Sequence, residues 1–229
     1  MKSVAIITAR GGSKRIPKKN IKDFCGKPIL AYSIEAAVSS GLFDEVMVST
    51  DSDEISQVAN RYGAKTPYVR SAETSNDFAT TSDVLEEVVK NYQDDGIFFD
   101  VVCCIYPTAP FITADKLKSA MSLFVEKDAS CVTPVVKFSF PPQRAVIVRD
   151  ERIVFNQPEH AKTRSQDLEP FYHDCGQFYI LKTQDLLNYH SILPPNTYPF
   201  FMSEEEVQDI DNPSDWEMAE MKYRILHNK

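Results

Sequence analysis

Short, nearly wholly apolar runs alternate with segments of helical periodicity along most of this chain. The runs at residues 4–8 and 100–105 are apolar on both alternating faces, which is typical of strands buried inside a parallel sheet. A helical segment such as 28–40 follows, where Pro28 suits the first turn and Gly41 the C-terminal cap. This order predicts an α/β fold with a mostly parallel sheet and helices on both faces.

The apolar runs and the segments of helical periodicity also predict where each strand and helix begins and ends. Strands are expected at residues 4–8, 45–50, 67–70, 100–105, 130–136 and 177–181, and helices at about 28–40, 51–62, 81–92, 114–126 and 215–226. The helix at 51–62 is expected to begin with a capping box, because Asp51 stands three residues before Glu54.

The pattern changes between residues 137 and 170. Apolar runs at 146–148 and 153–155 flank a charged turn, as in a β-hairpin. We interpret this stretch as an arm that leaves the sheet rather than as a second domain, because a chain of 229 residues is most often one domain. Residues 1–229 are therefore expected to form a single domain with an inserted arm at about 137–170.

Charge, cysteine content and hydropathy exclude several classes of protein. The chain has 25 basic and 33 acidic residues, a net charge of −8, which argues against nucleic acid as a partner. Its five cysteines include no Cys-x-x-Cys pair, so neither a disulfide framework nor a zinc site is expected, and Cys103 and Cys104 are expected to be reduced core residues. The apolar runs are too short for a membrane span or a signal peptide, so we expect a cytoplasmic protein with no membrane partner.

The loop after the first strand carries a dense basic cluster. Six basic residues and no acidic residue lie between positions 10 and 22. Two glycines permit unusual backbone angles that let main-chain N–H groups converge on an anion, and a serine adds a hydroxyl donor. The predicted triphosphate-binding residues are Arg10, Gly11, Gly12, Ser13, Lys14 and Lys19. The loop matches neither a Walker A motif nor a dinucleotide fingerprint, and the alternative is a solvated basic turn.

An acidic pair, Asp209 and Asp211, stands near the C-terminus. Alternate side chains of an extended segment share a face, so the two carboxylates are expected on one side, with Cα atoms roughly 6.6 Å apart. Mg²⁺ is held by one or two carboxylates together with phosphates, so the pair is a candidate site for Mg²⁺ or Mn²⁺. The alternative is that Asp211 merely begins the last helix, with Asn212 and Pro213 as the turn.

Polar residues at other positions have ordinary structural explanations as well as functional ones. Asp51 follows the second strand, where a helix cap explains it equally well. Thr108 lies in a turn made rigid by two prolines and is a candidate donor to a base or phosphate, although a plain loop is equally consistent. His173 is interpreted as a packed or substrate-contacting residue, because no serine or cysteine motif supports a hydrolytic triad.

Five segments combine into one recognisable pattern. They are Ala-Arg-Gly-Gly-Ser-Lys-Arg-Ile-Pro-Lys-Lys-Asn-Ile (9–21), Gly-Lys-Pro (26–28), Val-Ser-Thr-Asp (48–51), Val-Arg-x-Ala-Glu (69–73) and Asp-Ile-Asp (209–211). This pattern resembles the acylneuraminate cytidylyltransferases, which include the CMP-sialate synthetases, and it covers essentially the whole chain. Residues 163–168, 172–174 and 206–211 are most similar to the pseudaminic acid branch of that family.

The resemblance implies a Rossmann-like nucleotidyltransferase fold and a CTP-dependent reaction. The anomeric hydroxyl of a nine-carbon 2-keto sugar acid would attack the α-phosphorus of CTP, giving a CMP-sugar and pyrophosphate. Positioning and charge neutralisation account for most of such catalysis, so no protein nucleophile is required.

The resemblance also implies roles for individual residues. The triphosphate would be bound by Arg10, Ser13, Lys14 and Lys19, and the rest of the nucleotide by Asn20, Arg70 and Thr81. The metal would be held by Asp209 and Asp211, and catalysis would depend on Arg10, Lys14, Lys19 and Asp211. The arm would join two copies of the chain into a homodimer.

The sugar acid is expected to contact the segment 162–177. Its carboxylate needs a fixed cation, and Arg164 is the candidate because its planar fork suits a carboxylate. The alternative is a surface arginine paired with Asp167. Further candidates for contact with the sugar are Tyr106, Tyr172, His173 and Gln177.

Two departures from the sialate synthetase pattern favour a bis-amino sugar such as pseudaminic acid. Tyr106 stands where those enzymes have a glutamine, and Arg15-Ile16 stands where they often have Gly-Leu. A CMP-N-acetylneuraminate or legionaminate synthetase is the alternative within the family.

Two other classes of protein are alternatives to an enzyme of this family. A nicotinamide dehydrogenase would share the α/β class, but its glycine fingerprint is absent from the sequence. A non-catalytic nucleotide-sensing domain would keep the basic loop and would not need the acidic pair. Pyrophosphate release on mixing with CTP, Mg²⁺ and a sugar acid would distinguish the enzyme from the sensor.

Overall fold

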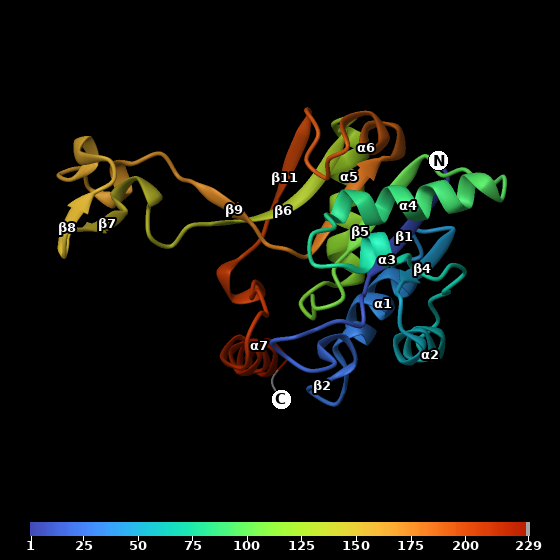
Figure 1. Cartoon of the computed structure of the whole chain (residues 1–229). Helices are drawn as coiled ribbons and strands as arrows, with labels where there is room; N and C mark the ends of the chain where they lie inside the picture. The colour runs from blue at the N-terminus through green and yellow to red at the C-terminus, as the bar shows by residue number, and fades with distance from the viewer. Residues whose placement is uncertain (228–229) are drawn as a thin grey trace.

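The structure, a computed structural model that describes residues 1–227, is built around one seven-stranded sheet (Figure 1). The strand order is β11-β6-β10-β5-β1-β4, and β9 pairs with β6 beside this path. The strands are β1 (Ser3–Thr8), β4 (Glu45–Ser49), β5 (Val101–Ile105), β6 (Cys131–Lys137), β9 (Tyr172–Asp174), β10 (Phe178–Lys182) and β11 (Thr197–Phe201). Two small pairs lie outside this sheet: β2 (Asp23–Phe24) with β3 (Lys27–Pro28), and β7 (Val146–Arg149) with β8 (Arg152–Phe155).

The strands of the large sheet run in one direction except β9 and β10. β1 is parallel to both of its neighbours, β4 and β5, and β6 is parallel to β11. β10 runs antiparallel between β5 and β6, and β9 runs antiparallel to β6. The predicted mostly parallel sheet is confirmed, and the direction of β10 is the feature that its apolar pattern did not reveal.

Helices cover both faces of the sheet. They are α1 (Ile29–Ser40), α2 (Asp53–Arg61), α3 (Ala72–Ser75), α4 (Thr81–Asp94), α5 (Ala114–Glu126), α6 (Thr183–Tyr189) and α7 (Pro213–Leu226). Ala5 and Ile7 of β1 pack in the apolar layer that contains α1, α2 and α5, whereas Val4 and Ile6 pack with α4 and α6. Alternation along β1 therefore buries both of its faces, and each large side chain so buried contributes about 1.5–3 kcal/mol to folding.

Two expectations about local structure are wrong. Residues 67–70 form no strand and make only the isolated bridge between Val69 and Thr50, because Pro67 has no N–H to donate. No capping box opens α2, whose N-cap Ser52 makes no side-chain cap hydrogen bond. Asp51, the expected cap, instead accepts a hydrogen bond from the backbone of Gly11. The sequence patterns also did not predict β2, β3, α3, β9, α6 and β11.

The arm between β6 and β9 leaves the body of the molecule and ends in the β7–β8 hairpin (Figure 1). Its two-residue turn is Asp150–Glu151, with φ angles of 49° and 61°. Left-handed angles at both turn residues match the right-handed twist of the flanking strands. The predicted hairpin is confirmed, and its Val148 and Ile153 side chains are each 72% exposed.

The cysteines and the helices agree with the sequence analysis. All five cysteines are free, and Cys103, Cys104, Cys131 and Cys175 are buried. Burial raises the pKa of the Cys131 and Cys175 thiols to about 12. None of the helices within residues 1–227 combines the length and apolar character that a membrane span requires.

Candidate active site

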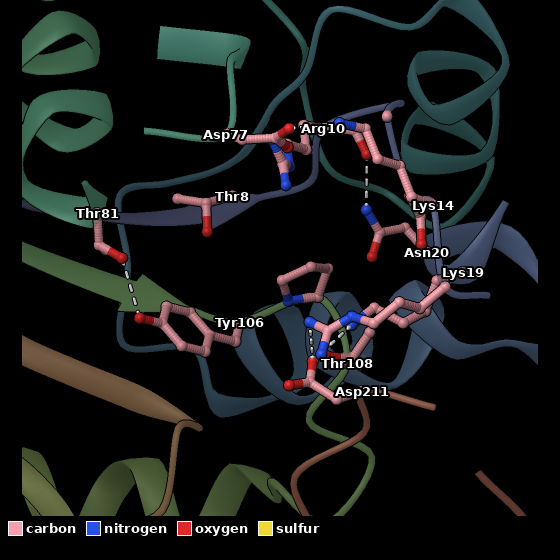
Figure 2. A pocket seen from close by; sticks show the side chains of 14 residues that line it. Thr8, Arg10, Lys14, Lys19, Asn20, Asp77, Thr81, Tyr106, Thr108 and Asp211 are labelled. Atoms are coloured by element: carbon pink, nitrogen blue, oxygen red, sulfur yellow. Dashed lines mark hydrogen bonds and ion pairs between the residues drawn. The ribbon is translucent and has the colours of Figure 1, made fainter. Parts of the chain in front are cut away.

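A cavity of about 620 Å³ opens at the carboxyl ends of β1 and β5 (Figure 2). The loop that follows β1, the turn that follows β5 and the first residue of α4 all contribute to it. It is lined by Thr8, Arg10, Gly12, Ser13, Lys14, Arg15, Lys19, Asn20, Asp77, Thr81, Tyr106, Pro107, Thr108 and Asp211. The fold therefore brings most of the predicted nucleotide residues together with Tyr106 and Asp211.

The glycines of the basic loop do not have the unusual backbone angles that we expected. Neither Gly11 nor Gly12 has a positive φ, whereas Lys18 has a φ of 51°. Gly11 is needed for close packing instead, because a Cβ there would lie 3.1 Å from Cβ of Ser52. The N–H of Gly11 donates to Oδ1 of Asp51 at 2.7 Å, so this carboxylate fixes the start of the loop.

Ser13 and Asn20 hold the conformation of the same loop. Oγ of Ser13 donates to the carbonyl of Ile16 at 2.6 Å, and Nδ2 of Asn20 donates to the carbonyl of Arg10 at 2.9 Å. The hydroxyl proton that we assigned to an anion is therefore used within the loop. Contact of either side chain with a nucleotide stays a prediction.

Asp77 contacts two cations of the loop at the wall of the cavity (Figure 2). Its carboxylate lies 2.8 Å from Nη1 of Arg10 and 2.5 Å from Nζ of Lys14. Hydrogen bonds from Lys14 and Arg10 hold the pKa of Asp77 below its usual value. These side chains are all partly exposed, so the ion pairs contribute little to stability.

Asp211 faces two further cations of the loop. It accepts a hydrogen bond from Nη2 of Arg15 at 2.8 Å and lies 3.8 Å from Nζ of Lys19. Burial lowers the pKa of Lys19, and the charges of Asp211 and Asp209 oppose that shift. Four cations that face two carboxylates give the cavity a net positive charge, which suits an anionic ligand.

A smaller cavity of about 130 Å³ adjoins the first. Thr8, Arg10 and Thr81 line both cavities, and Arg70 lines only the smaller one. Arg70 is 8% exposed and donates from Nη2 to the carbonyl of Thr74 at 2.5 Å, and burial lowers its pKa. Its Nε is buried without a hydrogen-bond partner in the described part of the chain. A buried unpaired donor costs free energy.

The residue between Asp209 and Asp211 is buried, whereas the two aspartates are not. Ile210 is 1% exposed and packs among the aromatic residues of α7, whereas Asp209 and Asp211 lie on the solvent side. Asn212 and Asp215 form the capping box of α7, so Asp211 is not needed to begin that helix. Its carboxylate faces the cavity instead.

The predicted sugar residues other than Tyr106 do not line the cavity of the single chain. Arg164, Tyr172 and His173 are exposed on the arm or at its root. No ion pair joins Arg164 to Asp167 within residues 1–227, so the alternative that we considered for this arginine is not supported either. Gln177 is buried and donates to the carbonyl of Glu206 at 2.8 Å.

The sequence analysis did not single out Thr8 and Asp77 as site residues. Thr8 is the last residue of β1, and this position was itself a usable signal because ligands bind beyond the carboxyl ends of parallel strands. Asp77 lies in an irregular segment after α3, where no periodicity or spacing distinguishes it from a surface acid.

The model of the cytidylyltransferase family matches residues 4–221 of the chain. The chain belongs to the cytidylyltransferase family. This cytidylyltransferase is 42% identical to the pseudaminic acid cytidylyltransferase of Campylobacter jejuni over 99% of its own length and 98% of the relative. It is 34% identical to the CMP-N,N'-diacetyllegionaminic acid synthase of Legionella pneumophila, over 96% and 95% of the two chains. It is 31% identical to the N-acylneuraminate cytidylyltransferase of Streptococcus agalactiae, over 94% of this chain and 52% of that one.

Two solved structures share the fold of this cytidylyltransferase. CMP:2-keto-3-deoxy-manno-octonic acid synthetase, solved with CTP, superposes with a TM-score of 0.72 at 20% identity over the whole of both chains. The 4-diphosphocytidyl-2C-methyl-D-erythritol synthase of Anaerococcus prevotii superposes with a TM-score of 0.64 at 15% identity over 97% of this chain and 98% of that one. The predicted nucleotidyltransferase fold and the predicted family are both confirmed.

Proposed function

We propose that this cytidylyltransferase joins CTP to pseudaminic acid, a nine-carbon 2-keto sugar acid, and releases pyrophosphate. Support for the sugar comes from the pseudaminic acid enzymes of Campylobacter jejuni, at 42% and 41% identity, since the legionaminic and neuraminic acid enzymes are less similar. The observation that most supports this reaction is the group of cations in the loop after β1. These cations face one cavity at the carboxyl ends of the strands.

The triphosphate is assigned to the basic loop. Arg10, Lys14 and Lys19 reach into the cavity, and phosphate oxygens would take the place that Asp77 holds beside the first two. Charge-assisted hydrogen bonds of this kind are roughly twice as strong as neutral ones. Their cations would offset the charge that develops on the pyrophosphate as it departs.

The cytosine base is assigned to the smaller cavity. Nε of Arg70 would there find the acceptor that the protein does not supply, and Thr81 would offer its hydroxyl to the base. Asn20, on the far side of Arg10, would contact the sugar of the nucleotide. Because the ribose joins the base to the α-phosphate, the α-phosphorus would follow the ribose within the larger cavity, beside the cations of the loop.

The chemical step needs positioning more than a reactive side chain. The anomeric oxygen of the sugar acid forms a bond to the α-phosphorus, and the bond from that phosphorus to the bridging oxygen breaks, so that pyrophosphate leaves with the electron pair. The proton of the anomeric hydroxyl passes to solvent or to a neighbouring carboxylate. Alignment of the two reactants in the cavity supplies a large part of the rate.

Mg²⁺ or Mn²⁺ is proposed at Asp209 and Asp211. Carboxylate oxygens suit a hard cation. Asp211 lies in the cavity, 3.8 Å from Nζ of Lys19, whereas Asp209 is exposed two residues away and does not line the cavity, so it would have to turn toward the ion. No group of three potential ligands occurs within residues 1–227, so phosphates and water would complete the shell. Bound there, the ion would neutralise charge on the departing pyrophosphate.

The arm is proposed to join two copies of the chain. Its hairpin presents apolar side chains to solvent, which is unusual for a surface unless another surface covers them. In such a homodimer, exposed Arg164, Tyr172 and His173 would contact the sugar at the cavity of the partner subunit. The five free cysteines fit a reducing compartment, and we infer that the enzyme acts in the cytoplasm.

The decisive experiment is pyrophosphate release from CTP and Mg²⁺ with a panel of sugar acids. Pseudaminic acid is expected to give the highest kcat/KM, followed by N,N'-diacetyllegionaminic acid and then N-acetylneuraminic acid. A higher value for either of the other sugars would assign the chain to that substrate instead. No release with any sugar acid, despite CTP binding, would favour a nucleotide sensor.

A further inference from the structure

Three successive backbone carbonyls hold the two arginines to which the proposed function assigns parts of CTP. The carbonyl of Thr74 accepts a hydrogen bond from Nη2 of Arg70 at 2.5 Å. The carbonyl of Asn76 accepts from Nη1 of Arg10 at 2.8 Å, and the carbonyl of Ser75 lies 3.5 Å from the same nitrogen. The direction of both guanidinium groups therefore depends on where this stretch of backbone lies.

The stretch consists of the end of α3 and the residue that follows it, and α3 is too short to fix its own position. It has four residues, about one turn, and a single turn is not stable by its own hydrogen bonds. Contacts with a larger element must therefore hold it in place.

Glu87 of α4 binds α3 near both of its ends. Its Oε1 accepts from the backbone N–H of Ser71, the N-cap of α3, at 2.9 Å. Its Oε2 accepts from the hydroxyl groups of Ser71 and Thr74, each at 2.6 Å. Hydrogen bonds to an ionised acceptor are roughly twice as strong as those between neutral groups. The carboxylate thus ties α3 to α4.

α4 is a firm support for these bonds. It has 14 residues, begins with a capping box formed by Thr80 and Asp83, and packs Leu85 and Val88 into the same apolar layer as β1. Glu87 itself is not among the described residues that line either cavity, so it would act on a bound nucleotide through α3 rather than by contact.

We infer that Glu87 is a positioning residue for CTP, which fixes α3 and thereby aims Arg70 and Arg10 at the nucleotide. The inference rests on the proposed function and deepens it, because it adds a residue that does not touch the ligand. A planar guanidinium binds best when its donors are aimed at the acceptor, and a misplacement of about 1 Å in an active site can cost on the order of 10²-fold in rate.

Glu87→Ala tests the inference because it removes all three bonds to α3. KM for CTP is expected to rise about tenfold or more, whereas KM for the sugar acid at saturating CTP should stay near the wild-type value. A protein that is merely loosened would show equal rises in both constants, and that result would overturn the inference. Circular dichroism and a melting temperature above the assay temperature check that the variant is folded.

Two further variants test the hydrogen bonds themselves. In Glu87→Gln the amide oxygen can accept from the N–H of Ser71, and the amide nitrogen can donate to the hydroxyl oxygens of Ser71 and Thr74. KM for CTP should therefore stay within about threefold of the wild-type value. Thr74→Val loses one hydroxyl and keeps Glu87, so KM for CTP should rise by about threefold to tenfold. If Glu87→Gln is as impaired as Glu87→Ala, the charge and not the hydrogen bonds is what matters, and the positioning role is rejected.

Glu86→Ala is the matched control, because it removes the same side chain from the neighbouring position of α4. Glu86 contacts Nδ1 of His190 at 3.0 Å, at the end of α6. KM for CTP in this variant should equal the wild-type value.

A double-mutant cycle shows whether the effect passes through Arg70. The loss of CTP affinity caused by Glu87→Ala should be smaller in an Arg70→Ala background, because one of the groups that Glu87 positions is then missing. The same loss in both backgrounds would contradict the inference.

Calorimetric titration with CTP separates this inference from the proposed function. If the wild type binds CTP and releases pyrophosphate while Glu87→Ala binds CTP with the wild-type Kd, the inference fails and the proposed function stands. A wild type that does not bind CTP rejects both.

Discussion

The carboxylate of Asp77 lies 2.8 Å from the guanidinium of Arg10, on the side of the cavity to which we assign the phosphates of CTP. It also contacts Lys14, so it competes with phosphate oxygens for two cations. Asp77→Asn is therefore expected to lower KM for CTP by a factor of about two to five, the size of couplings between exposed charges, with kcat unchanged. Steady-state kinetics at low and high salt check this, because screening should shrink the effect. Asp53→Asn, an exposed acid at the start of α2, is the control, and a KM at or above the wild-type value in Asp77→Asn contradicts the competition.

Two lysines of the basic loop provide a matched test of the phosphate site. Lys14 lines the cavity, whereas Lys18 turns outward to Glu54 at 2.7 Å. Lys14→Gln is expected to reduce kcat/KM for CTP at least about tenfold, because it removes a charge-assisted hydrogen bond. Lys18→Gln should stay near the wild-type value, and both variants should melt near the wild-type temperature. Equal kinetics for the two variants would remove the triphosphate from this loop.

The metal proposal predicts that activity requires Mg²⁺ or Mn²⁺ and is abolished by EDTA. Asp211→Ala should lower turnover by about 10² or more, as expected when charge stabilisation in the transition state is lost. Its melting temperature should hardly change, because Asn212 and Asp215, and not Asp211, cap α7. Asn212→Ala should show the reverse pattern, with a stability loss of about 1 kcal/mol and smaller effects on turnover. A large stability loss in Asp211→Ala with turnover intact would mean that this carboxylate serves the fold alone.

The hydrogen bonds of Glu87 predict a contribution to the free energy of unfolding that depends on pH. Burial tends to raise the pKa of Glu87, but hydrogen bonds from Ser71 and Thr74 outweigh it and the net pKa is lowered. A carboxyl group with a lowered pKa in the folded state stabilises the protein above its unfolded pKa of about 4.3, and this contribution is lost as the pH falls through the folded value. Glu87→Gln should therefore lower the free energy of unfolding by about 1 kcal/mol at neutral pH, with a smaller difference in strong acid. Urea unfolding at several pH values measures this, and a difference that is constant with pH would refute the assignment.

The proposed dimer predicts a mass near twice 26.0 kDa by light scattering at working concentration. Ile153→Glu places a charge on the most exposed part of the hairpin and should shift the mass to that of one chain. Val125→Glu, at an exposed position of α5 far from the arm in sequence, should keep the dimer. A wild-type mass near 26.0 kDa would reject dimerisation through the arm.

Apolar periodicity predicted most strands and helices. It did not predict features that depend on chain connectivity or on a single proline. Short central strands such as β5 are apolar on both faces, and a run of this length and composition is typical of a buried strand. The bounds of β10 were close to those expected, but its direction depends on how the arm returns, and periodicity is the same in both directions. Residues 67–70 have a strand-like composition, yet Pro67 limits their pairing to one bridge at Val69.

The candidate site was predictable where residue type and strand ends coincide. The basic loop follows β1 directly, and its Arg10, Lys14 and Lys19 line one cavity at the strand ends, although their contact with a triphosphate stays a prediction. Asp77 was missed because its role depends on where an irregular segment passes, which no local pattern encodes. The role of Asp51 was also unpredictable, since the same residue suits a helix cap and the observed bond to Gly11.

The reversed direction of β10 decides where the arm can be attached. β6 leaves the sheet at the edge that carries the cavity, and β10 enters the sheet at that same edge, so both ends of the arm are anchored there. A parallel strand in that place would have required the chain to cross to the opposite edge before it returned. The carbonyl of Gln177, where the chain returns from the arm, accepts a hydrogen bond from the backbone N–H of Tyr106, which lines the cavity. The segment that returns from the arm is therefore joined directly to the wall of the cavity, so the proposed contact of the arm with a second chain would be made by an element anchored at the candidate site.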